Sequence, residues 1–237
     1  MFKDTAFKTC RLLRNGDSES AKQLIEKFLN DNPITFHKNT KYYYFDSFTD
    51  EVIFNSILNK DKTKITILKD DYPIVFNDYG RILMENDEYF KAKTYLKLAN
   101  DLNPLNIQYK YNLIKVYDYE TNYEMIEKTL KDALLTVHDI NDLFGIYESL
   151  GYYYKQIKKC EISEILFNLN CKSISKIDKT LLKEKFKEYD ISLGFNADVI
   201  NAVDYASTLC DKKGDLTNSY LIYQDYWELY EFNKKFE

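Results

Sequence analysis

Phe76-Asn77-Asp78-Tyr79-Gly80 is followed at regular intervals by Ala92, Leu96, Ala99 and Pro104. Gly80 and Ala92 are small enough for the two helices of a hairpin to approach closely, while the larger apolar side chains fill the space between them. Pro104 marks the end of the second helix, because proline has no N–H and its ring clashes with the preceding turn. The spacing predicts a hairpin of two helices over residues 73–106.

This arrangement recurs along the chain, which indicates stacked helical units. Residues 107–140 follow without a gap, but Ile114 and Ile126 stand at the small positions, so we expect a wider hairpin there. A third unit is displaced by three residues. The sequence thus divides into an N-terminal hairpin (1–34), a linker with one helix (35–72), three repeat units (73–177, as 73–106, 107–140 and 144–177), a bridging helix and loop (178–199) and a C-terminal hairpin (200–237).

The repeated pattern resembles the tetratricopeptide repeat (TPR) family, whose unit has 34 residues. The three central units match closely and the two outer hairpins loosely, in a way similar to prokaryotic TPR-domain proteins. The resemblance implies an all-α fold, a TPR-like α-solenoid of stacked antiparallel helix hairpins that forms a right-handed superhelix. It also implies a non-enzymatic scaffold or adaptor that binds a partner protein or peptide.

In this family the first helix of each unit lines a concave groove that holds the partner segment. The resemblance therefore implies ten groove residues, namely Asn77, Arg81 and Glu85 from the first unit, Tyr111, Asn112, Lys115 and Tyr119 from the second, and Glu148, Tyr152 and Lys155 from the third. Asn can both donate to and accept from peptide amides, and Tyr offers rigid contact area. The alternative function is a peptide-sensing regulator whose array changes shape on ligand binding. The first 33 residues are too short for the DNA-binding domain that such regulators usually carry in front.

The composition argues against several other classes of protein. Only 6 Gly and 3 Pro occur, which disfavours turn-rich β-sandwiches and nucleotide-binding domains with glycine loops. A net charge of -5 and the near absence of arginine argue against nucleic acid as a partner. No apolar run is long enough for a membrane span or a signal peptide, so we expect a cytoplasmic protein. The cysteines lack metal-binding spacings and are expected as buried, reduced thiols: Cys10, Cys160, Cys171 and Cys210.

No pattern of residues indicates catalysis. The two histidines, His37 and His138, are expected at a linker surface and at a helix end. Motifs typical of hydrolases, zinc sites and phosphate binding are missing from the sequence. The carboxylate pairs Asp70-Asp71 and Asp46/Asp50 are expected to be solvated or to cap helices. We therefore expect no enzymatic activity, no cofactor and no metal.

The segments outside the repeats carry their own signals. Ser47 and Asp50 have the spacing of a capping box and predict a helix over about residues 48–59. The aromatic run at residues 41–45 is expected either to pack against the first hairpin and the array or to form one wall of a binding site. Residues 64–68 look extended but have no partner strand in the sequence, so we expect a loop or a short edge piece.

Two further segments lie near the C-terminus. Residues 178–189 are expected as a charged helix that buries Leu181, Leu182 and Phe186 and bridges the third unit and the last hairpin. The pairs Tyr226-Trp227 and Leu229-Tyr230 give the last helix an aromatic end. This end is expected either to cap the stack or to dock on another surface.

Overall fold

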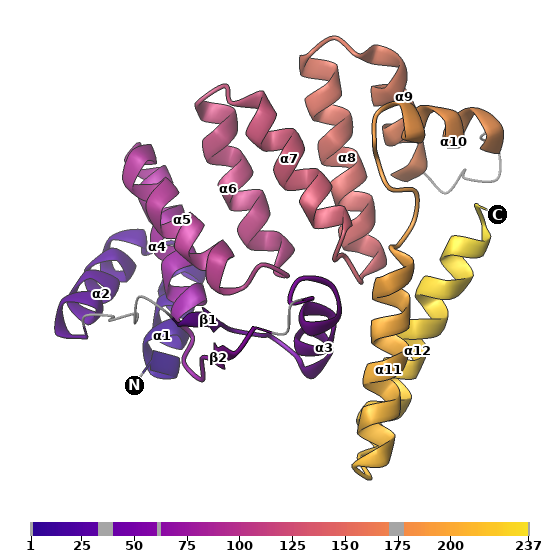
Figure 1. Ribbon diagram of the computed structural model, residues 1–237. Helices are drawn as coiled ribbons and strands as arrows, with labels where there is room; N and C mark the ends of the chain where they lie inside the picture. Colours follow the sequence, from indigo (N-terminus) through magenta and orange to yellow (C-terminus); the bar gives the residue numbers. More distant parts are fainter. Residues whose placement is uncertain (1, 33–39, 61–62, 171–177, 237) are drawn as a thin grey trace. The chain divides into compact units, whose positions relative to one another are not determined.

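The computed structural model describes residues 2–32, 40–60, 63–170 and 178–236. Helices dominate these residues, and two short strands accompany them (Figure 1). They group into two compact units, the first formed by Met1–Asp46 with Thr63–Thr121 and the second by Ser47–Lys62 with Asn122–Glu237. The elements follow in the order α1 (Phe2–Arg14), α2 (Ser18–Asp31), β1 (Lys41–Tyr43), α3 (Phe48–Ile57), β2 (Ile65–Ile67), α4 (Tyr72–Glu85), α5 (Tyr89–Leu102), α6 (Ile107–Tyr119), α7 (Tyr123–Leu134), α8 (Ile140–Gln156), α9 (Cys160–Asn170), α10 (Lys179–Glu188), α11 (Ala197–Lys212) and α12 (Leu216–Lys234).

The predicted hairpin at residues 73–106 is present as α4 and α5 in the first unit. Pro73 stands in the first turn of α4, where its missing N–H costs no hydrogen bond. Ala92, Leu96 and Ala99 of α5 are fully buried. A Cβ atom placed on Gly80 would lie 2.6 Å from Cγ of Leu96, so only glycine permits this approach of the two helices. The pair has the register of a TPR unit, and the all-α, TPR-like fold is confirmed.

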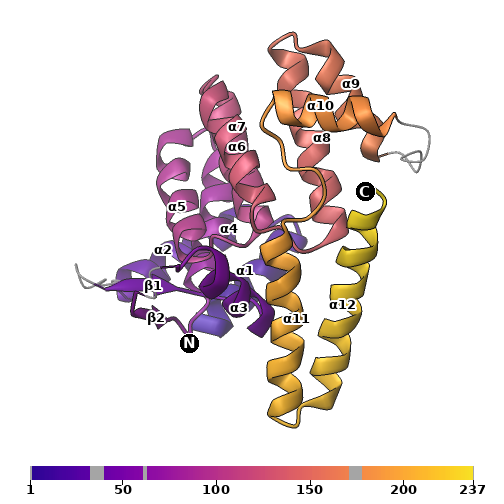
Figure 2. The ribbon, with the colours of Figure 1, turned by 45° about the vertical axis from the view of Figure 1, so that its right-hand side comes forward.

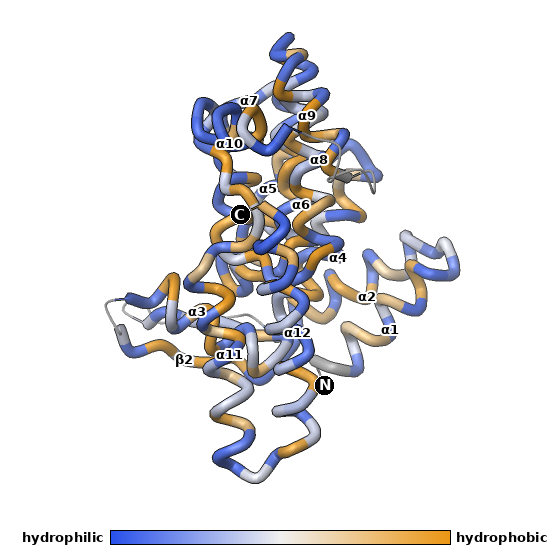
Figure 3. Tube along the Cα trace, turned by 90° about the vertical axis from the view of Figure 1, so that its right-hand side faces the viewer, coloured by the Kyte–Doolittle hydropathy of each residue, from blue (hydrophilic) through white to orange (hydrophobic). Residues whose placement is uncertain are grey.

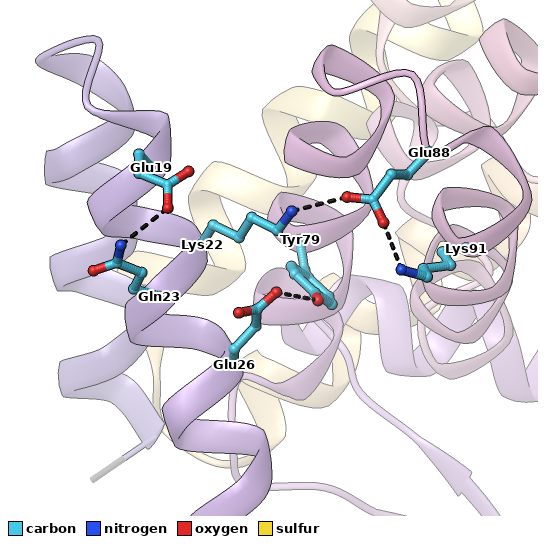
Figure 4. A network of polar contacts seen from close by, with 7 residues as sticks. All are labelled: Glu19, Lys22, Gln23, Glu26, Tyr79, Glu88 and Lys91. Atoms are coloured by element: carbon cyan, nitrogen blue, oxygen red, sulfur yellow. Dashed lines mark hydrogen bonds and ion pairs between the residues drawn. The ribbon is translucent and has the colours of Figure 1, made fainter.

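The first hairpin, α1 and α2, packs against α4 within the same unit. Figure 4 shows the polar contacts that join α2 to the α4–α5 hairpin. Lys22 pairs with Glu88 at 2.8 Å, and the hydroxyl of Tyr79 donates to Glu26 at 2.9 Å. Hydrogen bonds from Lys22 and, to a smaller extent, from Lys91 lower the pKa of the Glu88 carboxyl to about 2. The N-terminal hairpin is therefore part of the folded array.

Residues 64–68 contain a short edge strand, β2, as one of the two expectations has it, but the prediction that this strand has no partner is wrong. β2 pairs with β1 in a parallel two-stranded sheet, with Tyr42 opposite Thr66. Parallel strands need a long connection, and here the connection contains α3. Three-residue strands separated by a helix carry too little alternation to be matched by sequence pattern alone.

The aromatic run packs against the array, as the first of its two interpretations expects. Tyr42 lies on a buried cluster formed by Phe76, Ala99, Leu102 and Tyr109 of α4, α5 and α6. The backbone N–H of Tyr44 donates to the carbonyl of Leu102 at 2.7 Å. The apolar side of β1 is thus part of the core of the first unit.

The second unit contains the hairpin of α8 and α9. Gly151 again provides the close approach, because a Cβ atom there would lie 3.0 Å from the ring of Phe167. The hydroxyl of Ser163 donates to the carbonyl of Gly151 at 2.9 Å and joins the two helices. Of the two helices in the predicted repeat at residues 107–140, α6 belongs to the first compact unit and α7 to the second. The width of that hairpin and the right-handed superhelix therefore stay predictions.

The last hairpin, α11 and α12, also lies in the second unit, and its helices run side by side in both views (Figures 1 and 2). The hydroxyl of Ser207 donates to the carbonyl of Ser219 at 2.9 Å where the two helices meet. Helix α3 packs on α11, and it begins with the predicted capping box of Ser47 and Asp50. Apolar and polar residues alternate along the helices of each unit (Figure 3), as helices with one buried face require.

Two expectations about burial are wrong in part. On α10, Leu182 and Phe186 are buried, but Leu181 is exposed, because a residue beside Leu182 points about 100° away around a helix. Among the cysteines, Cys210 is buried and Cys10 partly so, whereas Cys160 is exposed at the start of α9. Cys171 lies outside the described residues.

Candidate functional site

The first unit has an open hollow of about 500 Å³ between α4, the start of α5 and α6. Of the seven groove residues expected in this unit, the hollow brings together five, and the other two, Asn77 and Tyr111, do not line it. We call it the α4–α6 hollow, and its lining residues are Arg81, Met84, Glu85, Tyr89, Asn112, Lys115, Asp118 and Tyr119.

A pair of asparagines joins α4 and α6 beside this hollow. The side-chain N–H of Asn112 donates to the side-chain oxygen of Asn77 at 2.8 Å, and the two residues are 8% and 7% exposed. A buried amide costs free energy unless it is hydrogen-bonded, so this bond stabilises the contact between the two helices. Asn77 and Asn112 therefore have a structural role whether or not a ligand reaches Asn112.

Two tyrosines form an aromatic wall of the hollow. The rings of Tyr89, at the start of α5, and Tyr119, at the end of α6, stack with their centroids 3.7 Å apart and their planes 8° from parallel. Tyr119 is exposed, so one side of the stack is open to a ligand. Stacked rings have little freedom left to lose, so they offer contact area at a low entropic cost.

The charges around the hollow are mixed in sign. Arg81 and Lys115 are basic, and Glu85 and Asp118 are acidic. The buried carboxyl of Asp78 lies 3.6 Å from the guanidinium of Arg81. Burial raises the pKa of Asp78 to about 6, and the positive charge of Arg81 opposes this rise. Glu85 accepts a hydrogen bond from Ser18 of α2 at 2.8 Å. With both signs present, the hollow matches a segment with polar groups of both kinds better than a single anion.

The remaining three expected residues lie on α8 in the second unit. Glu148, Tyr152 and Lys155 are spaced by four and three residues, so they share one face of the helix. Tyr152 is exposed and packs edge-on against the ring of Phe167, with centroids 4.9 Å apart. These residues form a polar face with one exposed aromatic ring.

Sequence reasoning missed a second hollow, of about 460 Å³, beside α7 in the second unit. Lys131 lines this hollow, donates to the carbonyl of Tyr189 at 2.7 Å and pairs with Glu127 at 2.9 Å. Glu127 also accepts from the hydroxyls of Tyr153 and Tyr154, at 2.7 Å and 2.8 Å. No sequence motif marks this network, because its members come from α7, α8 and the segment after α10. Its groups satisfy one another, so it joins these elements.

His138 follows α7, as expected, but it is held in place. Its Nε2 lies 3.0 Å from Oδ1 of Asp50 in the capping box of α3. Burial lowers the pKa of His138, while the hydrogen bond and charge of Asp50, with smaller effects from the carbonyl of Thr136 and from Asp142, raise it overall. Asp225 of α12 also faces this histidine. His37 lies outside the described residues.

The other expected polar pairs have structural partners. Asp46 accepts from the side chains of Asn103 and Asn106, each at 2.9 Å, and Asp71 accepts from the hydroxyl of Tyr44. Among the residues that the structure describes, no group of three or more His, Cys, Asp or Glu is placed to hold a metal ion. None of the described helices has both the length and the apolar composition needed to cross a membrane.

Comparisons with known proteins yield similarity at the level of structure. No protein-family model matches the sequence, and no curated protein does. Among solved structures, MamA 41-end from Desulfovibrio magneticus RS-1 is 14% identical, with a TM-score of 0.41 over 97% of this chain and 94% of that one. A putative kinesin light chain of Podosopora anserina, described as nearly identical TPR-like repeats, is 9% identical, with a TM-score of 0.45 over 96% of this chain and 94% of that one. The assignment of this chain as TPR-like rests on its own helix pairs, above all on the close approach of α4 and α5 at Gly80.

Proposed function

We propose that this protein is a non-enzymatic scaffold or adaptor that binds a segment of a partner protein in the α4–α6 hollow. The observation that carries this proposal is the hollow itself, where a stacked tyrosine pair stands beside two cations and two carboxylates. In the second unit, the polar face of α8 formed by Glu148, Tyr152 and Lys155 is proposed as a binding surface of its own.

The chemistry of the hollow favours a peptide as its occupant. Arg and Tyr are enriched among the residues that contribute most to protein–protein binding. The Tyr89–Tyr119 stack can receive an apolar or aromatic side chain, and Arg81 and Lys115 can receive a carboxylate or a backbone carbonyl. Glu85 and Asp118 disfavour a polyanion, because like charges brought together at an interface weaken binding.

The proposal is tested with a displayed library of random peptides. Sequences that bind the wild-type chain are measured against the variant Arg81→Ala/Lys115→Ala/Tyr119→Ala. Asn112 is left unchanged, because its loss would disturb the contact with Asn77. The matched control, Phe90→Ala/Lys91→Ala/Lys97→Ala, removes one aromatic ring and two cations from exposed positions of α5 outside the hollow.

We expect the hollow variant to bind selected peptides at least about tenfold more weakly, since each truncated residue of a binding centre costs on the order of 1 kcal/mol or more. The control variant should bind as the wild type does. Equal affinity of the wild type and the hollow variant, with circular dichroism unchanged, would show that peptides do not bind here.

The alternative function, a peptide-sensing regulator, requires the array to change shape when a peptide binds. The observation that supports this alternative is the division of the chain into two compact units. Small-angle scattering with and without a selected peptide separates the two functions. A smaller radius of gyration with peptide supports the regulator, and an unchanged profile at saturation supports the scaffold.

A further inference from the structure

Helix α12 carries two apolar faces, of which one is buried. Ile222, Leu229 and Phe232 are buried on the side that packs in the second unit. A second row of residues lies on another side of the helix, and all of them except the half-buried Tyr230 are exposed. We call it the outer seam, and it consists of Leu216, Tyr220, Tyr223, Trp227, Tyr230 and Lys234.

The outer seam has the exposure of a surface that lacks its partner. Leu216 is 67% exposed, Tyr220 61%, Tyr223 43% and Trp227 41%. Large apolar side chains in one contiguous row on a soluble surface commonly mark an interaction site.

The spacing of the seam residues indicates that the seam fits another helix. Its residues follow at intervals of four, three, four, three and four, an average near 3.5 residues. This is the repeat of the a and d positions of a coiled coil, which keeps one narrow row facing a partner helix. At about 1.5 Å per residue, the row is about 27 Å long.

The aromatic rings of the seam are already arranged for packing. Trp227 meets Tyr223 and Tyr230 edge-to-face, with centroids 6.1 Å and 5.5 Å apart. The ammonium group of Lys234 lies 4.4 Å from the centroid of Tyr230. Side chains ordered before binding lose less entropy on binding, so the free surface is preorganised.

We propose that the outer seam forms a homodimer, in which α12 packs antiparallel against α12 of a second copy of this chain. In an antiparallel pair, each a position lies beside a d position of the other helix. Tyr223 then meets the partner's Trp227, Tyr220 meets the partner's Tyr230, and Leu216 meets the partner's Lys234. Every residue of the seam meets another residue of the seam, so the row is self-complementary under the two-fold symmetry of a dimer.

Charge selects the antiparallel orientation over the parallel one. A parallel pair would place Lys234 in the same layer as the partner's Lys234, and such like charges destabilise the contact. In the antiparallel pair Lys234 lies at the end of the seam and keeps its 3.3 Å ion pair with Glu231 of its own helix.

The residues beside the seam are also compatible with the antiparallel pair. One flank consists of Thr217, Gln224 and Glu231, and the other of Ser219, Tyr226 and Asn233. In an antiparallel pair each flank meets the same flank of the other copy, so Glu231 faces the partner's Thr217. No two like charges meet along either flank.

The area of the seam sets the expected strength. The four most exposed apolar residues of the seam present on the order of 100 Å² each, so these four in two copies bury about 800 Å², and the other two seam residues add to that area. Specific interfaces bury at least about 1,000 Å² in total, and the flanking residues add buried area to that of the seam. We therefore expect a reversible dimer that dissociates in the micromolar range.

Sedimentation of the full chain across a dilution series tests the dimer. The wild type should move from twice its 28.3 kDa mass at high concentration to one chain on dilution. Tyr223→Glu should stay at one chain throughout, and Tyr220→Lys provides a second disruption in another layer. The matched control is Tyr205→Glu, which places the same charge at a 53% exposed tyrosine of α11 and should dimerise like the wild type.

Trp227 is the one tryptophan in the sequence, so its fluorescence reports directly on the seam. The emission of the wild type should shift to the red on dilution, and that of Tyr223→Glu should be independent of concentration. Circular dichroism must show that each variant remains helical. The proposal would be refuted if the wild type were monomeric at every concentration, or if the Tyr223→Glu variant dimerised like the wild type.

Cysteine cross-linking tests the orientation. In an antiparallel dimer Gln224 lies close to the partner's Gln224, whereas Lys234 and the partner's Lys234 lie at opposite ends of the seam. Under mild oxidation Gln224→Cys should give a linked dimer above the level of the wild type, whose native thiols set the baseline, and Lys234→Cys should not. The reverse result would mean that the helices are parallel and that the proposed pairing is wrong.

Discussion

The close approach of α4 and α5 makes Gly80→Ala a direct test of the repeat register. A methyl group at residue 80 would lie 2.6 Å from Cγ and 2.7 Å from Cδ2 of Leu96, and 3.3 Å from the carbonyl oxygen of Ala92. Leu96 is fully buried in a close-packed core, and rotation about its Cβ–Cγ bond leaves Cγ in place, so moving the terminal methyl groups does not relieve the contact. One of the two helices has to move.

The size of the effect follows from two opposing contributions. An extra methyl group in a well-packed core costs about 1–3 kcal/mol. Alanine is a better helix former than glycine by about 1 kcal/mol, which offsets part of that cost. Because the contact at Gly80 is so short, we expect the upper part of the range and a net loss of about 1–2 kcal/mol.

Gly151→Ala is the matched comparison. A Cβ atom at Gly151 would lie 3.0 Å and 3.2 Å from ring atoms of Phe167, and a shift of a few tenths of an ångström relieves these contacts. The gain in helix propensity then offsets most of the packing cost. We expect this variant to be within about 0.5 kcal/mol of the wild type, although it makes the same chemical change in a helix.

Urea denaturation followed by circular dichroism measures both variants. With a slope of about 2 kcal/mol per molar urea, a loss of about 1–2 kcal/mol moves the midpoint by about 0.5–1 M. Trp227 lies in the second unit, so its fluorescence follows that unit and circular dichroism follows both. This separation identifies which unit a substitution weakens.

A double-mutant cycle identifies the cause of the loss. Leu96→Ala alone should cost about 2–5 kcal/mol, because it leaves a cavity. The methyl group of Gly80→Ala would partly fill that cavity, so the two losses together should be smaller than their sum by about 1 kcal/mol. Strict additivity, or a Gly80→Ala variant as stable as the wild type, would refute the register.

Three further outcomes are expected. Asn112→Ala should cost about 1–3 kcal/mol in urea denaturation, because it leaves the buried amide of Asn77 without this bond. Tyr147→Phe should cost a similar amount, since the hydroxyl of this buried residue donates to the carbonyl of Ser192 and accepts from the N–H of Gly194. The pKa of His138 is raised in the folded state, so its contribution is complete below the unfolded pKa near 6.5 and is lost as pH rises through the folded value. Unfolding midpoints at acidic and alkaline pH should therefore differ more in the wild type than in His138→Gln.

The architecture of the repeats could be predicted because it depends on side-chain size at fixed positions. Gly80, Ala92 and Ala99 are small where helices approach, and this constraint is local enough to be visible in one sequence. The capping box of Ser47 and Asp50 is visible for the same reason, since both residues lie within one turn. Where a signal is contained within one hairpin or one turn, sequence is sufficient.

The features that sequence missed depend on contacts between distant segments. The pairing of β1 and β2 joins strands separated by a helix, and neither strand is long enough to show alternation. Tyr89 belongs to the second helix of its hairpin, outside the positions that the family resemblance assigns to the groove. Its stacking on Tyr119 depends on how α5 packs beside α6, which no local pattern encodes.

The asparagine pair shows why the role of a polar residue is harder to predict than its position. An amide that can donate and accept matches a peptide backbone, and the same property matches another amide. Because first helices of adjacent repeats face each other, Asn77 of α4 and Asn112 of α6 can satisfy one another, and their 2.8 Å bond shows that they do. Recognition of a partner then falls to residues one and two turns further along the same helices, where Arg81, Lys115 and Tyr119 are exposed. A ligand of the hollow should therefore be sensitive to those three side chains, whereas the stability of the first unit should be sensitive to the asparagines.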